Sequence, residues 1–128
     1  MKISIITSVY NNKETIKDAI ESVLNQTYKN IEYIIVDGAS SDGTIEIVES
    51  YGDKISTFVS ESDEGIYDGL NKGVSLSTGD VVAFLHSDDI YASDNIVQKI
   101  ADEFIQDSLL DGVYGDLVYT PKDDTSKV

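Results

Sequence analysis

The chain has 128 residues, of which 41% are hydrophobic, and it carries a formal net charge of −15 with no cysteine. This length and apolar content are typical of one globular domain, and the missing cysteines exclude disulfides, thiolate metal sites and a cysteine nucleophile. The acidic surplus disfavours nucleic acid and anionic membranes as partners, since both are bound mainly through positive patches.

The first half of the chain alternates apolar and amphipathic segments. Residues 2–9 are apolar and rich in β-branched side chains, which predicts a buried strand. Residues 13–25 carry apolar side chains at helical spacing, and Asn11 or Asn12 is the expected N-cap of this helix. The sequence then predicts a second strand, a polar turn and a second helix at residues 32–36, 37–43 and 44–51.

The second half repeats this alternation. A third strand, a third helix and a fourth strand are predicted at residues 55–60, 66–77 and 81–85. A fourth helix follows at residues 92–106, capped by Ser93 or Asp94, and a last strand at residues 113–119. The polar residues 120–128 are expected to form a tail after one domain of residues 1–119. The pattern predicts an α/β fold with a mostly parallel, Rossmann-like sheet sandwiched by helices.

Polar clusters follow three of the predicted strands, at the edge where parallel sheets bind ligands. Asp37, after the second strand, is placed so that its carboxylate could accept hydrogen bonds from a ribose or from a base N–H. From the residues alone, this ligand role and plain turn chemistry are about equally supported. The clusters are Ser8, Tyr10, Asn11 and Asn12; residues 37–43; and His86, Ser87, Asp88 and Asp89.

Asp88 and Asp89 are adjacent carboxylates after an apolar strand, where burial strengthens their repulsion. A cation relieves this repulsion, and Mg²⁺ is usually held by one or two carboxylates together with substrate phosphates. A bound Mg²⁺ or Mn²⁺ would also allow so acidic a chain to accept a diphosphate. The alternatives are acids that favour the N-terminus of the next helix and acidity that serves solubility alone.

Residues 64–73 are unusual for a plain surface helix, because Gly69 and Gly73 each cost about 1 kcal/mol relative to alanine. Glycines at this spacing indicate the close approach of another backbone or of a ligand. Asp68, Asn71 and Lys72 lie on neighbouring turns and share roughly one face. Tight packing of a marginal helix on the sheet is the alternative.

Several segments, taken in order, resemble the opening of glycosyltransferase family 2. The resemblance runs from about Lys2 to Tyr119 and implies a GT-A type fold. It also implies inverting transfer from a nucleotide sugar, usually a UDP-sugar, to a saccharide or glycoconjugate acceptor in polysaccharide or glycoconjugate assembly. The segments are residues 5–11 (IITSVYN), 22–28 (SVLNQTY), 35–44 (IVDGASSDGT), 63–73 (DEGIYDGLNKG), 77–80 (STGD) and 87–89 (SDD).

The resemblance also implies roles for individual residues. Asp89 would coordinate Mn²⁺ or Mg²⁺, which bridges the diphosphate and stabilises the leaving group. The residues expected to bind the nucleotide sugar are Thr7, Val9, Tyr10 and Asn11 at the nucleotide, Asp37 at the base, Asp68 and Lys72 beside the donor, and Asp88 near the ribose. Family members run well past this length. The catalytic base is therefore expected beyond Val128, so that the part present would bind donor and transfer little or no sugar by itself.

A non-catalytic nucleotide-binding or regulatory α/β module is the alternative function. Phospho-receivers carry their acidic pair after the first strand, whereas here that strand ends in Tyr10, Asn11 and Asn12. A nucleotidyltransferase would show a glycine-rich, basic loop at the same place. Because the chain shows neither a signal peptide nor a membrane span, a cytoplasmic location is expected. Membrane-peripheral attachment of the full-length protein and its oligomeric state are left open.

Overall fold

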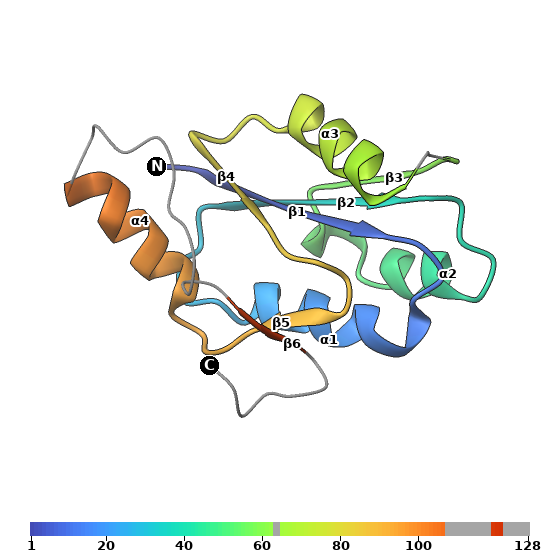
Figure 1. Cartoon of the computed structure of the whole chain (residues 1–128). Coiled ribbons are helices and arrows are strands. Elements are labelled where there is room, and N and C mark those ends of the chain that lie inside the picture. Colours follow the sequence, from blue (N-terminus) through green and yellow to red (C-terminus); the bar gives the residue numbers. More distant parts are fainter. Residues whose placement is uncertain (63–64, 107–118, 122–128) are drawn as a thin grey trace.

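The centre of the molecule is a four-stranded parallel sheet in the order β3–β2–β1–β4 (Figure 1). The computed structural model describes residues 1–62, 65–106 and 119–121. The strands are β1 (Ile3–Val9), β2 (Ile31–Asp37), β3 (Thr57–Ser60) and β4 (Val81–Phe84). The chain steps outward from β1 to β3 and then returns to the other side of β1, so strand order reverses between β1 and β4. In such sheets ligands bind at the carboxyl ends of the strands beside the reversal.

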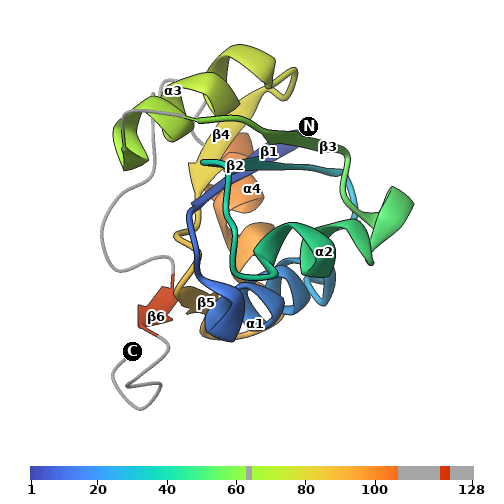
Figure 2. The same ribbon diagram turned by 90° about the vertical axis from the view of Figure 1, so that its right-hand side faces the viewer.

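Helices cover both faces of this sheet (Figure 2). One face carries α3 (Ile66–Leu76), and the other carries α1 (Lys13–Leu24) and α2 (Thr44–Glu49), with a short 3₁₀ turn at Gly52–Lys54 before β3. After β4 the chain forms β5 (Asp89–Tyr91), α4 (Ile96–Gln106) and β6 (Tyr119–Pro121). β5 pairs antiparallel with β6 and packs against α1. None of the helices in the described part of the chain is long and apolar enough to span a bilayer.

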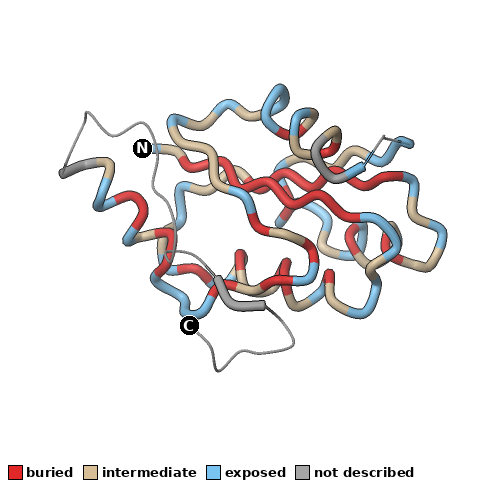
Figure 3. Tube along the Cα trace, viewed as in Figure 1, coloured by how far each residue is buried: buried red, intermediate tan, exposed pale blue. Residues whose placement is uncertain are grey.

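The sheet separates two apolar layers, because successive residues of a strand point to opposite faces. Ile5 of β1 packs with Ile16 of α1 in the larger core. The next residue, Ile6, packs with Ile34 and Leu70 on the α3 side. The buried colour runs along the whole of β1 (Figure 3). This arrangement confirms the predicted α/β sandwich with a mostly parallel sheet.

The region after β4 differs from the prediction. The sequence predicts a helix from residue 92 with Ser93 or Asp94 as its cap, but α4 begins at Ile96, and the N–H of Lys99 donates to the carbonyl of Asn95 at 3.1 Å. β5 was not predicted, because its three residues become a strand only by pairing with residues 119–121, far along the chain. The predicted last strand lies outside the described residues except for Tyr119, which begins β6. Of the predicted tail, residues 120–121 belong to β6, and residues 122–128 lie outside the described residues.

Gln26 holds the start of α4 in place, a role that the sequence pattern did not indicate. Gln26 is 1% exposed. Its Oε1 accepts a hydrogen bond from the N–H of Val97 at 3.0 Å, and its Nε2 donates to the carbonyls of Ser22 and Ser93 at 3.0 and 2.7 Å. A side chain just after α1 therefore supplies the cap for α4 that the sequence analysis assigned to Ser93 or Asp94.

Replacement of Gln26 by alanine is expected to lower the free energy of unfolding by about 2–4 kcal/mol, because three backbone groups lose their partner inside the protein. Urea unfolding followed by circular dichroism measures this change. Gln98→Ala is the matched control, since its amide contacts Asp102 at 2.9 Å on the surface and its loss should stay within about 0.5 kcal/mol. Equal stability of the two variants would contradict the capping role of Gln26.

Candidate functional site

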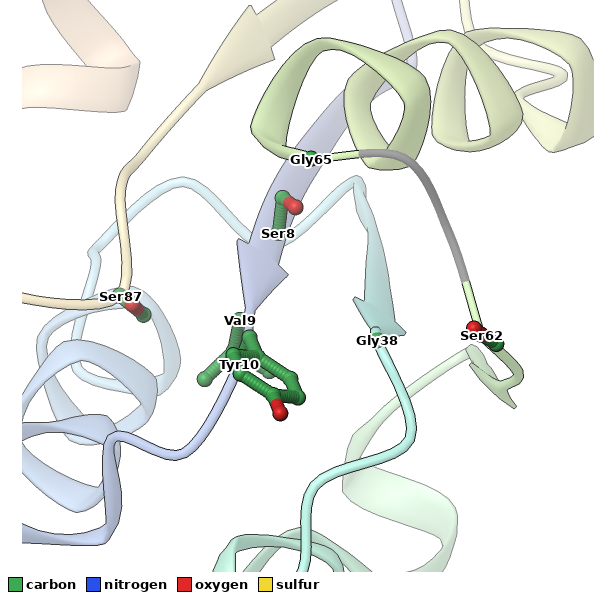
Figure 4. A pocket seen from close by; sticks show the side chains of 7 residues that line it. All are labelled: Ser8, Val9, Tyr10, Gly38, Ser62, Gly65 and Ser87. Atoms are coloured by element: carbon green, nitrogen blue, oxygen red, sulfur yellow. The ribbon is translucent and has the colours of Figure 1, made fainter.

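A cavity of about 490 Å³ opens at the carboxyl edge of the sheet (Figure 4). Tyr10 stands at the end of β1, with Ser87 on one side and Gly38 and Ser62 on the other. The volume lies within the roughly 300–1,000 Å³ of small-molecule sites. All four strand exits contribute, since the described lining residues are Ser8, Val9 and Tyr10 from β1, Gly38 after β2, Ser62 after β3, Gly65 before α3 and Ser87 after β4.

The chain turns sharply where β1 ends, and the turn leaves Tyr10 accessible. Asn11 has a φ of 47°, a left-handed conformation that asparagine tolerates better than most residues. Its N–H donates to Ser40 Oγ and its Oδ1 accepts from the N–H of Ser41, both at 2.7 Å. Tyr10 is 63% exposed. Of the predicted nucleotide contacts, Val9 and Tyr10 therefore line the cavity, and Asn11 fixes the loop after β2 beside them.

Asp37 lies at the end of β2 and is fully buried. Its Oδ2 accepts hydrogen bonds from the N–H of Ser40 and from Ser60 Oγ, both at 2.8 Å, and its Oδ1 accepts from Ser40 Oγ at 2.5 Å. The carboxylate thus ties the loop after β2 to the end of β3. Asp37 is not among the described residues that line the cavity, and its contact with a base stays a prediction.

The side chain of Thr7 points into the core on the α1 side of the sheet. Its Oγ1 lies 2.9 Å from the hydroxyl of Tyr33, and both residues are almost completely buried. Burial raises the pKa of the Tyr33 hydroxyl above its usual range. The structure therefore does not bring the Thr7 side chain to the cavity, although the sequence analysis expected it beside the nucleotide.

Lys72 and Asp68 lie one turn apart on α3, near the exit of β3. Lys72 Nζ lies 3.1 Å from Glu61 Oε1 and 3.6 Å from Asp68 Oδ2. It also donates to the carbonyl of Ser62 at 3.3 Å. Lys72 therefore places its ammonium group beside Ser62, which lines the cavity. Glu61 and Ser62 were not predicted, although their position directly after a strand was the signal that could have identified them.

Asp88 and Asp89 follow Ser87 on the β4 side of the reversal point. Asp88 is exposed, whereas Asp89 is only 8% exposed, and its N–H donates to the carbonyl of His86 at 3.0 Å. Burial raises the pKa of Asp89 above its ordinary value, the charge of Asp88 raises it further, and His86 acts in the opposite direction. The ionised pair is therefore unfavourable unless a positive charge compensates it.

The donor atoms of this pair fit a hard cation. Within the described ranges, no group of three or more histidine, aspartate or glutamate side chains could enclose a metal ion. Mg²⁺ and Mn²⁺ prefer oxygen ligands, and Mg²⁺ is commonly bound by one or two carboxylates together with water and phosphate oxygens. Asp88 and Asp89 could supply such carboxylates, with the remaining ligands provided by water or by a bound phosphate.

Comparisons with known proteins show which family the chain resembles. The family model described as Glycosyl transferase family 2 matches residues 4–127. An uncharacterized glycosyltransferase of Rickettsia typhi is 43% identical over 98 residues, which cover 77% of this chain and 30% of that protein. The putative glycosyltransferase EpsE of Bacillus subtilis is 35% identical over 104 residues, covering 78% and 37%. The chain thus spans about a third of the length of these curated relatives.

Solved structures share the fold. S. aureus TarS 1–349 in complex with UDP-GlcNAc superposes with a TM-score of 0.72 at 30% identity, covering 83% of this chain and 31% of that chain. The mannosyltransferase PcManGT from Pyrobaculum calidifontis, in complex with GDP-Man and Mn²⁺, gives a TM-score of 0.74 at 22% identity and covers 80% and 32%. At that identity the second match shows the fold alone. Both structures agree with the helix-covered, mostly parallel sheet predicted from the sequence.

Proposed function

Because the chain belongs to glycosyltransferase family 2, we propose that it forms the donor-binding part of an inverting glycosyltransferase. The donor is a nucleotide sugar, with a UDP-sugar as the expected class, bound together with Mg²⁺ or Mn²⁺. The acceptor is a saccharide or glycoconjugate. The observation that carries the proposal is the cavity at the carboxyl edge of the sheet, which has exposed Tyr10 at its centre and Ser87, the neighbour of Asp88 and Asp89, at its side.

Different residues around the cavity would bind different parts of the donor. The exposed ring of Tyr10 offers a flat apolar face on which a base stacks. The hydroxyls of Ser8, Ser62 and Ser87 offer hydrogen bonds to ribose or phosphate oxygens. Asp88 and Asp89 would hold the cation, which when bound neutralises charge on the diphosphate leaving group. The TarS complex supports a UDP-sugar, since that relative is 30% identical and its structure is a complex with UDP-GlcNAc.

The reaction also needs groups that bind the acceptor and deprotonate its attacking hydroxyl. The described residues that line the cavity are serines, glycines, a valine and a tyrosine, so no carboxylate or imidazole stands among them. The matched relatives are about three times as long as the region that they share with this chain. We propose that the acceptor site and the base belong to the part of such a glycosyltransferase that lies outside the region shared with this chain.

Calorimetric titration with UDP in the presence of Mn²⁺ tests this function. We expect the chain to bind UDP more tightly than GDP, and Tyr10→Ala to weaken UDP binding roughly 5- to 100-fold through loss of base stacking. Tyr10→Phe is the matched control, because it keeps the ring and should retain most of the affinity. Failure of UDP and UDP-sugars to bind would refute the proposal in favour of a module without a donor site. Equal UDP affinity of Tyr10→Ala would refute the stacking role of Tyr10 and place the nucleotide outside this cavity.

A further inference from the structure

We propose that Asn12 and Thr15, at the start of α1, are positioning residues that hold the Asp88–Asp89 loop in the arrangement a cation requires. The inference rests on the proposed function of that loop and assigns the two residues no contact with the donor itself. They belong to a different element from the carboxylates and were not among the predicted site residues.

Ser87 is held by α1 at two of its atoms. Asn12 Nδ2 donates to Ser87 Oγ at 2.9 Å, and Thr15 Oγ1 donates to the Ser87 carbonyl at 2.8 Å. Ser87 is 8% exposed, and both contacts are partly buried. The Ser87 carbonyl belongs to the planar peptide unit that leads into Asp88. The Thr15 hydroxyl therefore fixes the orientation of the backbone from which the first carboxylate projects.

These contacts fall in the middle of the stretch that connects two strands. Directly after β4, the N–H of Leu85 donates to the carbonyl of Ile6 in β1 at 3.0 Å. The chain enters β5 at Asp89, and the N–H of Asp89 closes a turn onto His86. Ser87 lies between these two points. The two hydrogen bonds between Ser87 and the start of α1 therefore attach the centre of this loop to the rest of the fold.

The side chain of Asn12 gives further support, because it bonds to Ser87 and does not cap its own helix. Asn12 is the N-cap residue of α1, yet its side chain makes no capping hydrogen bond. Such a bond normally contributes about 1 kcal/mol to helix stability. The backbone N–H of Asn12 donates instead to Thr44 Oγ1 at 3.1 Å, and the side-chain amide is directed to Ser87. The amide thus stabilises the loop rather than its own helix.

The expected consequence concerns cation affinity. Mg²⁺ requires ligand oxygens at about 2.0–2.1 Å in near-octahedral geometry, so a small displacement of the carboxylates weakens binding. Residues that orient metal ligands through hydrogen bonds typically change metal affinity 10- to 100-fold when they are replaced. Loss of either α1 contact should therefore lower the affinity for the cation. The cavity walls made by β1, β2 and β3 should stay unchanged.

Thr15→Val tests the proposal, because it removes the hydroxyl and keeps the size of the side chain. We expect Mn²⁺ affinity, measured with UDP present by electron paramagnetic resonance of the unbound ion, to fall about 10- to 100-fold. Thr15→Ser restores the hydroxyl and should restore the affinity. UDP affinity in excess chelator should be the same for all three proteins. Asn12→Ser keeps a favourable N-cap residue without the amide and provides a second variant with the same expected loss.

Glu32→Ala controls for general loss of stability. Glu32 accepts hydrogen bonds from Ser4 Oγ at 2.7 Å and from the N–H and hydroxyl of Thr78 at 2.8 and 2.9 Å, at the amino end of the sheet. This variant should lower the melting temperature without changing Mn²⁺ affinity. Unchanged Mn²⁺ affinity in Thr15→Val and Asn12→Ser, or an equal loss in Glu32→Ala, would overturn the positioning role alone. If the unsubstituted chain bound UDP with the same affinity with and without Mn²⁺, the proposed cation site would be overturned as well.

Discussion

Asp89→Asn is expected to abolish the effect of Mn²⁺ on UDP binding while leaving the fold at least as stable as before. The substitution keeps the size of the side chain but removes an anionic oxygen ligand. A cation that relies on two carboxylates should lose more than the roughly 100-fold typical of changes to the groups that orient its ligands. Titration of UDP into each protein, with Mn²⁺ and then with excess chelator, measures the loss.

The stability part of this result follows from the burial of Asp89. The residue is 8% exposed and adjacent to Asp88, and both burial and that neighbouring charge raise the pKa of its carboxyl group. At neutral pH the folded state therefore contains an ionised group in an unfavourable environment. A neutral amide removes the charge, so the free energy of unfolding in chelator should stay equal or rise.

The matched control for Asp89→Asn is Asp53→Asn. Asp53 is an exposed residue of the 3₁₀ turn before β3, at the opposite edge of the sheet, and its replacement changes the net charge by the same amount. UDP affinity and its response to Mn²⁺ should be unchanged in this variant. If Asp89→Asn kept the full response to Mn²⁺, the cation would have to bind elsewhere, and the role of the acidic pair would be wrong.

The parallel sheet was predictable because each of its strands is a short apolar run with its own local signal. β1 is buried along its whole length, and its seven residues read as strand without knowledge of any partner. β5 carries no such signal, since Asp89–Tyr91 is three residues long and acquires strand geometry from β6. The prediction of where α4 begins was wrong for a related reason. Its cap comes from Gln26, which lies 71 residues from Val97 in the sequence.

The sequence predicted the location of the candidate site better than it predicted which side chains line it. The strand exits are visible in the sequence, and the cavity lies among them. Local sequence could not tell, however, that Thr7 faces Tyr33 in the core while its neighbour Ser8 faces the cavity. Nor could it tell that the Asp37 carboxylate is already bonded to Ser40 and Ser60. Such assignments depend on which face of a strand is covered by which helix.

Gly79→Ala is expected to destabilise the fold by about 3 kcal/mol or more, at the upper end of what overpacking costs. Gly79 lies in the loop before β4, and its N–H donates to Ser4 Oγ at 2.9 Å. A Cβ at this position would lie 2.8 Å from the backbone nitrogen of Ser4 and 2.9 Å from the carbonyl oxygen of Lys2. Backbone atoms of β1 and the residue before it cannot rotate away as a side chain can.

Gly73→Ala provides the comparison that tests this reasoning. Alanine in a helix is normally about 1 kcal/mol better than glycine, but here its Cβ would lie 2.3 Å from Cγ2 of Ile6, a fully buried side chain. The variant should therefore lose stability, and Ile6→Ala should partly rescue it through a coupling of about 1 kcal/mol or more. Ser4→Ala should not rescue Gly79→Ala, because the backbone contacts remain. Denaturant unfolding of the single and double variants measures both couplings, and an equal rescue in the two cases would show that backbone approach is not what requires glycine at position 79.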